Sequence, residues 1–136
     1  MAESRRSQGL IDTSVVVDLG HIHADQLPIE MAVSAITMAE LAAGPHATSD
    51  PDERARRQDR LQRAEATFEP LPFDVDAARA YGVVYAAVAA TGRKGRGARS
   101  VDLLIAATAA AAQLPLYTRN PKDFAGLEGA VDIVAV

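Results

Sequence analysis

Short apolar runs alternate with longer helix-like segments along this chain, and this alternation restricts the fold more than any other feature of the sequence. The apolar runs are mostly continuous, as expected of strands that are covered on both faces. Strands that alternate with helices favour an α/β fold, in which helices flank a parallel sheet. We expect strands at residues 9–11, 30–36, 115–118 and 131–136, a strand or extended link at 69–73, and helices at 14–19, 37–44, 50–68, 75–90 and 101–114.

The length and composition suit one compact domain. The chain has 136 residues, and 49% of them are hydrophobic, which is enough to form a core. Residues 1–8 are polar and lack the apolar stretch of a signal peptide, so we expect a flexible arm at 1–8 and a single domain at 9–136. The longest weakly polar stretch, 101–116, is interrupted and too short to span a bilayer. Since the chain also has no cysteine, these features predict a cytoplasmic protein without a membrane segment.

The charge balance argues against general attraction to nucleic acid. The chain has 14 basic and 18 acidic residues and a formal net charge of −4. Binding to a polyanion must therefore come from a local basic patch or from a bound cation. One such patch is the glycine-rich stretch "RKGRGAR", which contains no acid and contributes Arg93, Lys94, Arg96 and Arg99. These side chains are candidates for contacts with RNA phosphates, and the alternative is a solvated loop.

A second group of arginines lies in the segment 50–68 and has a different interpretation. Its members are Arg54, Arg56, Arg57, Arg60 and Arg63. Three of them follow an acid by four residues, in the pairs Asp52–Arg56, Glu53–Arg57 and Asp59–Arg63. This spacing is typical of a solvated, charge-balanced helix, so we do not assign these arginines to nucleic-acid binding.

Acids recur where a strand or loop gives way to a helix or turn, at Asp12, Glu40, Asp102 and Asp123. Taken singly, each has a structural explanation. Glu40 completes a possible capping box that starts at Thr37. Asp102 and Asp123 would lie in the first turn of a helix, where an acid is stabilised by the positive end of the helix dipole.

Taken together, these acids favour a metal site. The carboxyl ends of parallel strands meet at one edge of the sheet, and open α/β proteins bind their ligands there. Asp12 and Asp102 would converge at this edge if their strands are neighbours. Carboxylates in a small cleft repel one another and lose hydration, and a divalent cation relieves both costs. Oxygen ligands of this kind favour Mg²⁺ or Mn²⁺.

The chain resembles a known family in four stretches, "LIDTSVVVDL", "SAITMAELAAG", "RSVDLLIAATA" and "LYTRNPKDFAGL". They extend from Leu10 to Leu127 and follow one another in the order found in PIN-domain ribonucleases, in particular the VapC-type toxins of bacterial toxin–antitoxin pairs. The resemblance implies a three-layer α/β fold around a parallel sheet and an acidic site that holds Mg²⁺ or Mn²⁺. It places the catalytic acids of the family at Asp12, Glu40, Asp102 and Asp123.

The resemblance also implies roles and partners. Asp12 and Asp102 would bind the metal, and neighbouring polar groups would orient the ligands, at Thr13, Ser14, Thr118 and Asn120. The expected activity is metal-dependent endoribonuclease cleavage of structured RNA, either tRNA or rRNA. The expected partners are a VapB-type antitoxin and a second copy in a homodimer. Part of an apolar stripe could serve that homodimer: Tyr81, Val84, Tyr85 and Val88.

Two other classes of protein stay open on the sequence alone. One is a catalytically silent binding module with a PIN-like fold, in which the acids only cap helices. The other is a receiver-like signalling domain that binds magnesium beside a phospho-acceptor aspartate. The receiver-like hypothesis is weaker, because the segment Asp12–Thr13–Ser14 lacks a second acid and Lys122 lies in a proline turn.

Overall fold

The computed structural model describes residues 5–92 and 98–136, apart from the side chains of residues 98 and 99. Its strands and α-helices are, in chain order, β1 (Gln8–Ile11), α1 (Thr13–Val17), β2 (Glu30–Ala32), α2 (Ala35–Ala43), α3 (Pro51–Thr67), α4 (Val75–Ala90), α5 (Ala98–Ala112), β3 (Leu116–Thr118) and β4 (Ile133–Ala135). Short 3₁₀ turns are η1 (Leu19–His21), η2 (Ala24–Gln26), η3 (Gly44–Ala47) and η4 (Pro121–Phe124).

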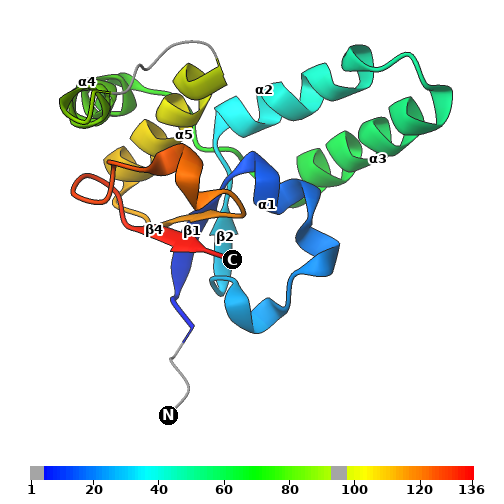
Figure 1. Cartoon of the computed structure of the whole chain (residues 1–136). Coiled ribbons are helices and arrows are strands. Elements are labelled where there is room, and N and C mark those ends of the chain that lie inside the picture. The colour runs from blue at the N-terminus through cyan, green and yellow to red at the C-terminus, as the bar shows by residue number, and fades with distance from the viewer. Residues whose placement is uncertain (1–4, 93–97) are drawn as a thin grey trace.

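The described strands form one parallel sheet in the order β2-β1-β3-β4. Leu10 of β1 pairs with Ala32 of β2 on one side and with Leu116 of β3 on the other. Helices α4 and α5 lie on one side of the sheet and α1 and α3 on the other, with α2 and α3 extending as a hairpin (Figure 1). The predicted α/β fold, a parallel sheet flanked by helices, is confirmed.

Two hydrophobic cores explain why the strands are apolar at successive positions. Side chains along a strand point alternately to opposite faces of the sheet. Leu10 and Leu116 pack in the core that α4 and α5 cover, whereas Ile11 and Tyr117 pack in the core beneath α1 and α3. Because both faces of β1 and β3 are largely buried, most residues of these strands are apolar at successive positions.

The second helix begins earlier than predicted, because the cap is a different residue. Ser34 is the N-cap of α2, and its Oγ accepts a hydrogen bond from the Thr37 backbone N at 3.0 Å. The predicted capping box between Thr37 and Glu40 is therefore wrong: Glu40 lies in the second turn of α2, too far along the helix to reach the cap.

Two other segments differ from their predicted boundaries. Helix α5 begins at Ala98, three residues before the predicted start, so Asp102 is not in its first turn. The segment 69–73 forms an isolated parallel bridge between Leu71 and Ser34 and does not join the sheet. Pro70 and Pro72 have no backbone N–H to donate, which prevents a longer strand here.

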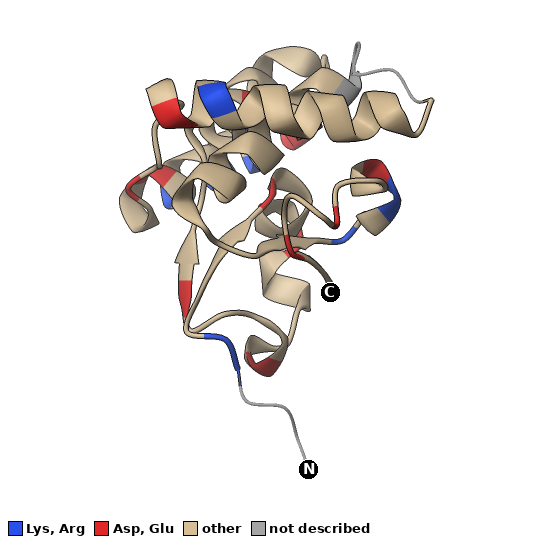
Figure 2. Cartoon of the chain, turned by 90° about the vertical axis from the view of Figure 1, so that its left-hand side faces the viewer, with Lys and Arg blue, Asp and Glu red and all other residues tan. Residues whose placement is uncertain are grey.

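On the side shown in Figure 2, acidic and basic residues are interspersed, and neither sign is concentrated on one part of the chain. This agrees with the small negative net charge of −4. Within residues 5–92 and 98–136, no helix is both long enough and apolar enough to cross a membrane.

Candidate active site

The strand order marks the carboxyl edge of β1 and β3 as the place for a site. The chain passes from β1 to β2 on one side, while β3 and β4 lie on the other side of β1. Where strand order reverses in this way, the connections leave the sheet edge in opposite directions, and open α/β proteins bind ligands between them. Asp12 directly follows β1, and Thr118 is the last residue of β3.

Asp12 is almost fully buried although it carries a carboxyl group, with 5% of its surface exposed. It is the N-cap of α1, and its Oδ1 accepts hydrogen bonds from Val15 N at 3.1 Å and from Ser14 Oγ at 2.6 Å. Burial raises the pKa of Asp12, because the charged form loses hydration, and the hydrogen bonds oppose part of this rise. A carboxylate that is shielded from water attracts a cation more strongly than a solvated one.

Ser14 connects Asp12 to the end of β3. Its Oγ donates to Asp12 and accepts a hydrogen bond from the Arg119 backbone N at 3.0 Å. The Thr118 Oγ1 lies 3.5 Å from Ser14 Oγ and accepts from Asn120 N at 3.0 Å. These contacts join residues more than 100 positions apart in the chain, so the carboxylate is held in one orientation by both strands.

Glu40 lies beside this network. The Thr13 Oγ1 donates to Glu40 Oε1 at 2.5 Å and lies 3.1 Å from Thr37 Oγ1. Because Thr13 directly follows Asp12, this hydrogen bond ties Glu40 of α2 to the residue next to the first acid. Glu40 is exposed, unlike Asp12, so its carboxylate is accessible to water and to a substrate.

The other two predicted acids are placed differently. Asp102 is half-buried in the second turn of α5, and Asp123 is exposed in η4. Helix α5 contacts both α2, which carries Glu40, and η4. In the described part of the chain, no three Asp, Glu or His side chains are close enough to form a metal-binding group. Among the described residues, the four predicted acids therefore do not form one close group.

The carboxylate oxygens in this hydrogen-bond network are suitable ligands for a hard divalent cation. Asp12 and Glu40 offer carboxylate oxygens, and each accepts a hydrogen bond from a neighbouring hydroxyl, Ser14 or Thr13, that fixes its orientation. Oxygen ligands of this kind suit Mg²⁺ or Mn²⁺ better than zinc or copper.

The predicted RNA-binding loop lies outside the described residues. This applies to Arg93, Lys94 and Arg96 and to the side chain of Arg99, whose backbone belongs to α5.

Most arginines of α3 have intramolecular partners, as the spacing predicts. Arg63 Nε lies 2.9 Å from Asp59 Oδ2, and Arg57 Nε lies 3.9 Å from Glu53 Oε2. The expected Asp52–Arg56 pair is replaced by an i,i+3 pair, in which Arg56 lies 3.2 Å from Glu53.

Two of these guanidinium groups also hold η3 and the loop after it. Arg57 donates to the Gly44 carbonyl at 2.9 Å, and Arg54 donates to the Pro45 carbonyl at 3.1 Å and to the Thr48 carbonyl at 2.9 Å. These arginines therefore have structural roles.

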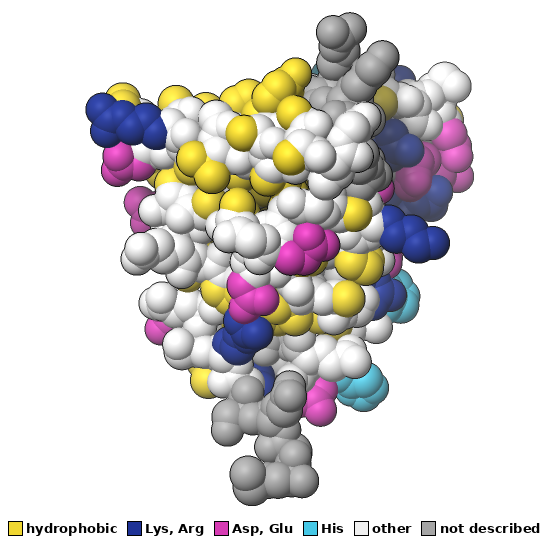
Figure 3. Space-filling view, turned by 60° about the vertical axis from the view of Figure 1, so that its left-hand side comes forward, with side chains coloured by type: hydrophobic (Ala, Val, Ile, Leu, Met, Phe, Trp, Pro, Cys, Tyr) yellow, Lys and Arg dark blue, Asp and Glu magenta, His cyan; other side chains and the backbone are white. Residues whose placement is uncertain are grey.

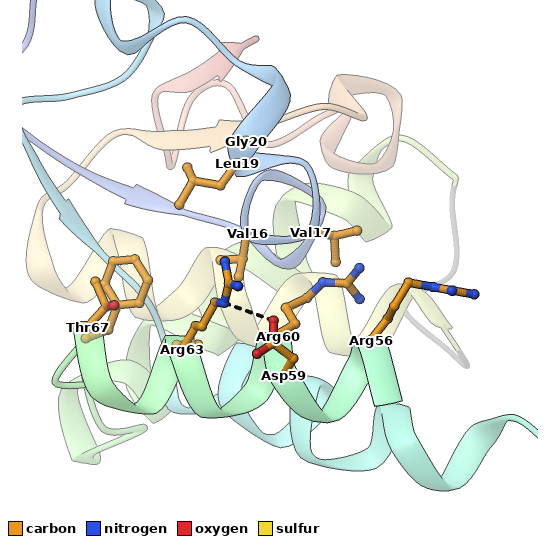
Figure 4. A pocket seen from close by; sticks show the side chains of 11 residues that line it. Val16, Val17, Leu19, Gly20, Arg56, Asp59, Arg60, Arg63 and Thr67 are labelled. Atoms are coloured by element: carbon orange, nitrogen blue, oxygen red, sulfur yellow. Dashed lines mark ion pairs between the residues drawn. The ribbon is translucent and has the colours of Figure 1, made fainter. Parts of the chain in front are cut away.

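A groove of about 510 Å³ separates α3 from the end of α1. Its apolar lining includes Val16, Val17 and Leu19, whose side chains point toward α3 in Figure 4. Arg60 and Arg63 project from α3 into the same space. Arg60 is the exception in its group, because within residues 5–92 and 98–136 its side chain has neither an ion pair nor a hydrogen bond, whereas Arg54 donates to backbone carbonyls.

Asp18 is a residue of the site region that the sequence did not point to, and its pairing with Arg119, which belongs to the family-like segment Thr118–Arg119–Asn120, was not predicted. Arg119 Nε lies 3.3 Å from Asp18 Oδ2, which joins the end of β3 to the end of α1. The two residues are 101 positions apart, so no local pattern could have paired them.

Comparison with known proteins agrees with this geometry. The chain matches the PIN domain family over residues 9–129. It is 38% identical to Ribonuclease VapC5 of Mycobacterium tuberculosis over 128 residues, and this stretch covers 92% of this chain and 91% of that protein.

Solved structures agree as well. The toxin–antitoxin structure VapBC-5 from Mycobacterium tuberculosis matches with a TM-score of 0.81 at 37% identity, over 96% of this chain and 99% of that one. VapBC2 from Rickettsia felis, solved with a DNA fragment from its promoter, shares the fold with a TM-score of 0.74 at 21% identity, over 95% of this chain and 98% of that one. From the family match over most of its length and its similarity to a named ribonuclease, we conclude that the chain belongs to the PIN domain family and, within it, to the VapC ribonucleases.

Proposed function

We propose that this protein is a metal-dependent endoribonuclease toxin that cleaves structured RNA, tRNA or rRNA, in the cytoplasm, and that its single domain spans residues 9–136. One observation carries the proposal: the buried Asp12 stands at the reversal of strand order, accepts from Ser14 of α1, which itself accepts from the Arg119 backbone after β3, and is followed by Thr13, which donates to Glu40. A desolvated carboxylate in such a network is costly for folding, and catalysis or metal binding accounts for that cost.

Asp12 and Asp102 are the proposed metal ligands, with Glu40 and Asp123 as the further catalytic acids. A bound Mg²⁺ or Mn²⁺ would lower the pKa of water and neutralise charge on the reacting phosphate. Contacts of α5 with both α2 and η4 support a shared region for these acids. The exposed Glu40 carboxylate is suited to orient the attacking water or accept its proton.

Polar neighbours would hold the ligands in position. Ser14 and Thr13 already donate to Asp12 and Glu40, and Thr118 extends this network to the backbone of Asn120. RNA is proposed to contact the basic stretch that precedes Asp102, at Arg93, Lys94, Arg96 and Arg99.

A VapB-type antitoxin is the proposed protein partner, since VapBC-5 is a toxin–antitoxin structure. The groove between α1 and α3 suits a segment of such a partner (Figure 4). Aliphatic side chains would pack on Val16 and Leu19, and a carboxylate would pair with Arg60. The groove follows α1 directly from Asp12, so one segment could fill it and also cover the site.

A homodimer is proposed on helix α4. An apolar surface runs over this helix in Figure 3, and its exposed members include Val75, Val83 and Tyr85, at 65%, 63% and 42% exposure. Of the apolar stripe considered from sequence, Val84 and Val88 are buried in the core, so only its tyrosine side is available to a second copy.

The decisive experiment is cleavage of total tRNA and rRNA by EDTA-washed protein with and without Mg²⁺ or Mn²⁺. Asp12→Ala and Asp102→Asn should abolish cleavage, and Asp52→Asn, an exposed acid of α3, is the matched control. Both variants must keep a cooperative thermal transition. Full activity of both site variants would reject the mechanism, whereas a parent with no cleavage and no Mn²⁺-dependent stabilisation would favour a catalytically silent module.

A further inference from the structure

We propose that Arg119 binds an RNA phosphate that flanks the scissile one, and that Asp18 holds the arginine side chain ready for this contact. The proposal rests on the proposed nuclease function and assigns a substrate-binding residue to it. It starts from the position of Arg119, which is the first residue after β3.

The backbone of Arg119 is fixed beside the candidate site. Its N–H donates to Ser14 Oγ at 3.0 Å, and the same hydroxyl donates to Asp12 Oδ1 at 2.6 Å. A single hydroxyl group thus separates the arginine backbone from the buried carboxylate. Any movement of Arg119 that broke this contact would also disturb Asp12.

The guanidinium is oriented by a different contact. Arg119 Nε lies 3.3 Å from Asp18 Oδ2, and the two side chains are 33% and 45% exposed. A guanidinium has five N–H donors in a planar fork, and only the Nε donor is engaged with Asp18 in this pair. The terminal nitrogens can therefore meet an incoming phosphate while Asp18 still holds the side chain.

The direction of the side chain identifies which phosphate it would meet. Asp18 lies six residues beyond Asp12 and ends α1, so its backbone is roughly 9 Å along the helix from the candidate site. The contact with Asp18 therefore directs the Arg119 side chain toward the end of α1 and away from Asp12. This position suits the next phosphate along a bound strand.

Electrostatics explain why the site needs such a cation. Asp12 and Glu40 repel an approaching polyanion, and the whole chain carries a net charge of −4. A partly exposed ion pair contributes little to folding stability, so the Asp18–Arg119 pair is not needed mainly for the fold. Holding a cation in place at the edge of an acidic site has a larger consequence for RNA binding.

The test measures the affinity of unfractionated tRNA in EDTA at 50–200 mM salt for the parent and Arg119→Gln. Loss of one phosphate contact should reduce the slope of log affinity against log salt by about 0.7–0.9. The ratio of parental to Arg119→Gln affinity should therefore fall about threefold between 50 and 200 mM salt. In cleavage assays KM should rise while kcat changes little. Arg119→Lys should keep the parental slope.

Two further variants separate binding from structure. Asp18→Asn removes the carboxylate that holds the guanidinium in place, so it should weaken tRNA binding by up to about fivefold even though it also removes a negative charge. Arg79→Gln, at an exposed pair with Asp76 on α4, is the control and should keep the parental slope.

The outcomes are distinct. An unchanged slope in Arg119→Gln together with a lower kcat would overturn the proposal and leave Arg119 a positioning residue. A parent that binds neither tRNA nor rRNA at any salt would overturn the nuclease function itself.

Discussion

Asp12 provides the sharpest test of the site, because its two roles make opposite contributions to stability. As the N-cap of α1 it accepts from Val15 N, which stabilises the helix. As a buried carboxylate, with 5% of its surface exposed, it loses hydration when the chain folds. Asp12→Asn keeps an oxygen at the cap and removes the charge, whereas Asp12→Ala removes both.

The magnitude follows from the contacts. Replacing a capping side chain by alanine costs about 0.5–2 kcal/mol. The lost hydrogen bond from Ser14 adds about 0.5–1.5 kcal/mol. The asparagine variant should therefore be more stable than the alanine variant by about 2 kcal/mol, or about 6–10 °C in Tm for a chain of this size. Neither variant should cleave RNA.

The dependence on pH has a definite sign. Burial raises the pKa of Asp12, so the folded chain binds this proton more tightly than the unfolded chain. The free energy of unfolding of the parent therefore decreases as the pH rises through that pKa. Asp12→Asn should be more stable than the parent at neutral pH, and the gap should close as the pH falls through the raised pKa.

Differential scanning fluorimetry in EDTA, repeated with Mn²⁺, measures all of these differences. Mn²⁺ should raise the Tm of the parent much more than that of Asp12→Asn, because the ion favours the charged carboxylate. Equal Tm values for the asparagine and alanine variants would refute the capping argument. A parent that is more stable than Asp12→Asn at neutral pH without metal would refute the argument from burial.

Two other substitutions test Ser14 and the groove between α1 and α3. Ser14→Ala removes the hydrogen-bond partner of Arg119 N and of Asp12, so it should destabilise the chain by about 1–3 kcal/mol and slow cleavage. Ser14→Thr keeps the hydroxyl and should keep most of the activity. A parental Tm and cleavage rate in the alanine variant would contradict the role of this hydroxyl. Arg60→Glu reverses the charge of one side chain in the groove between α1 and α3. It should weaken binding of the antitoxin encoded beside this chain at least tenfold, as measured by calorimetry, and leave RNA cleavage unchanged. If Arg60→Glu binds the antitoxin as tightly as the control Arg79→Glu, Arg60 is not part of the antitoxin interface.

Local sequence was sufficient where a residue's partners are near in the chain. Asp50 and Asp74 cap α3 and α4 through the amides of Asp52 and Ala77, which lie two and three residues away. Prediction failed at Glu40, where the capping-box spacing is present but the buried Ser34 caps the helix instead. Several residues could cap this helix, and packing against the sheet selected one of them.

The sequence by itself determined the alternation of strands and helices, the parallel arrangement and the acid at the end of β1, because these depend on periodicity and on the order of elements. Only the tertiary structure decided which polar groups meet at that acid. Ser14 reaches Arg119 across 105 residues, and Thr13 reaches Glu40 across 27. Such contacts arise when strands become neighbours in the sheet, and the distance between two residues in the chain carries no information about that pairing.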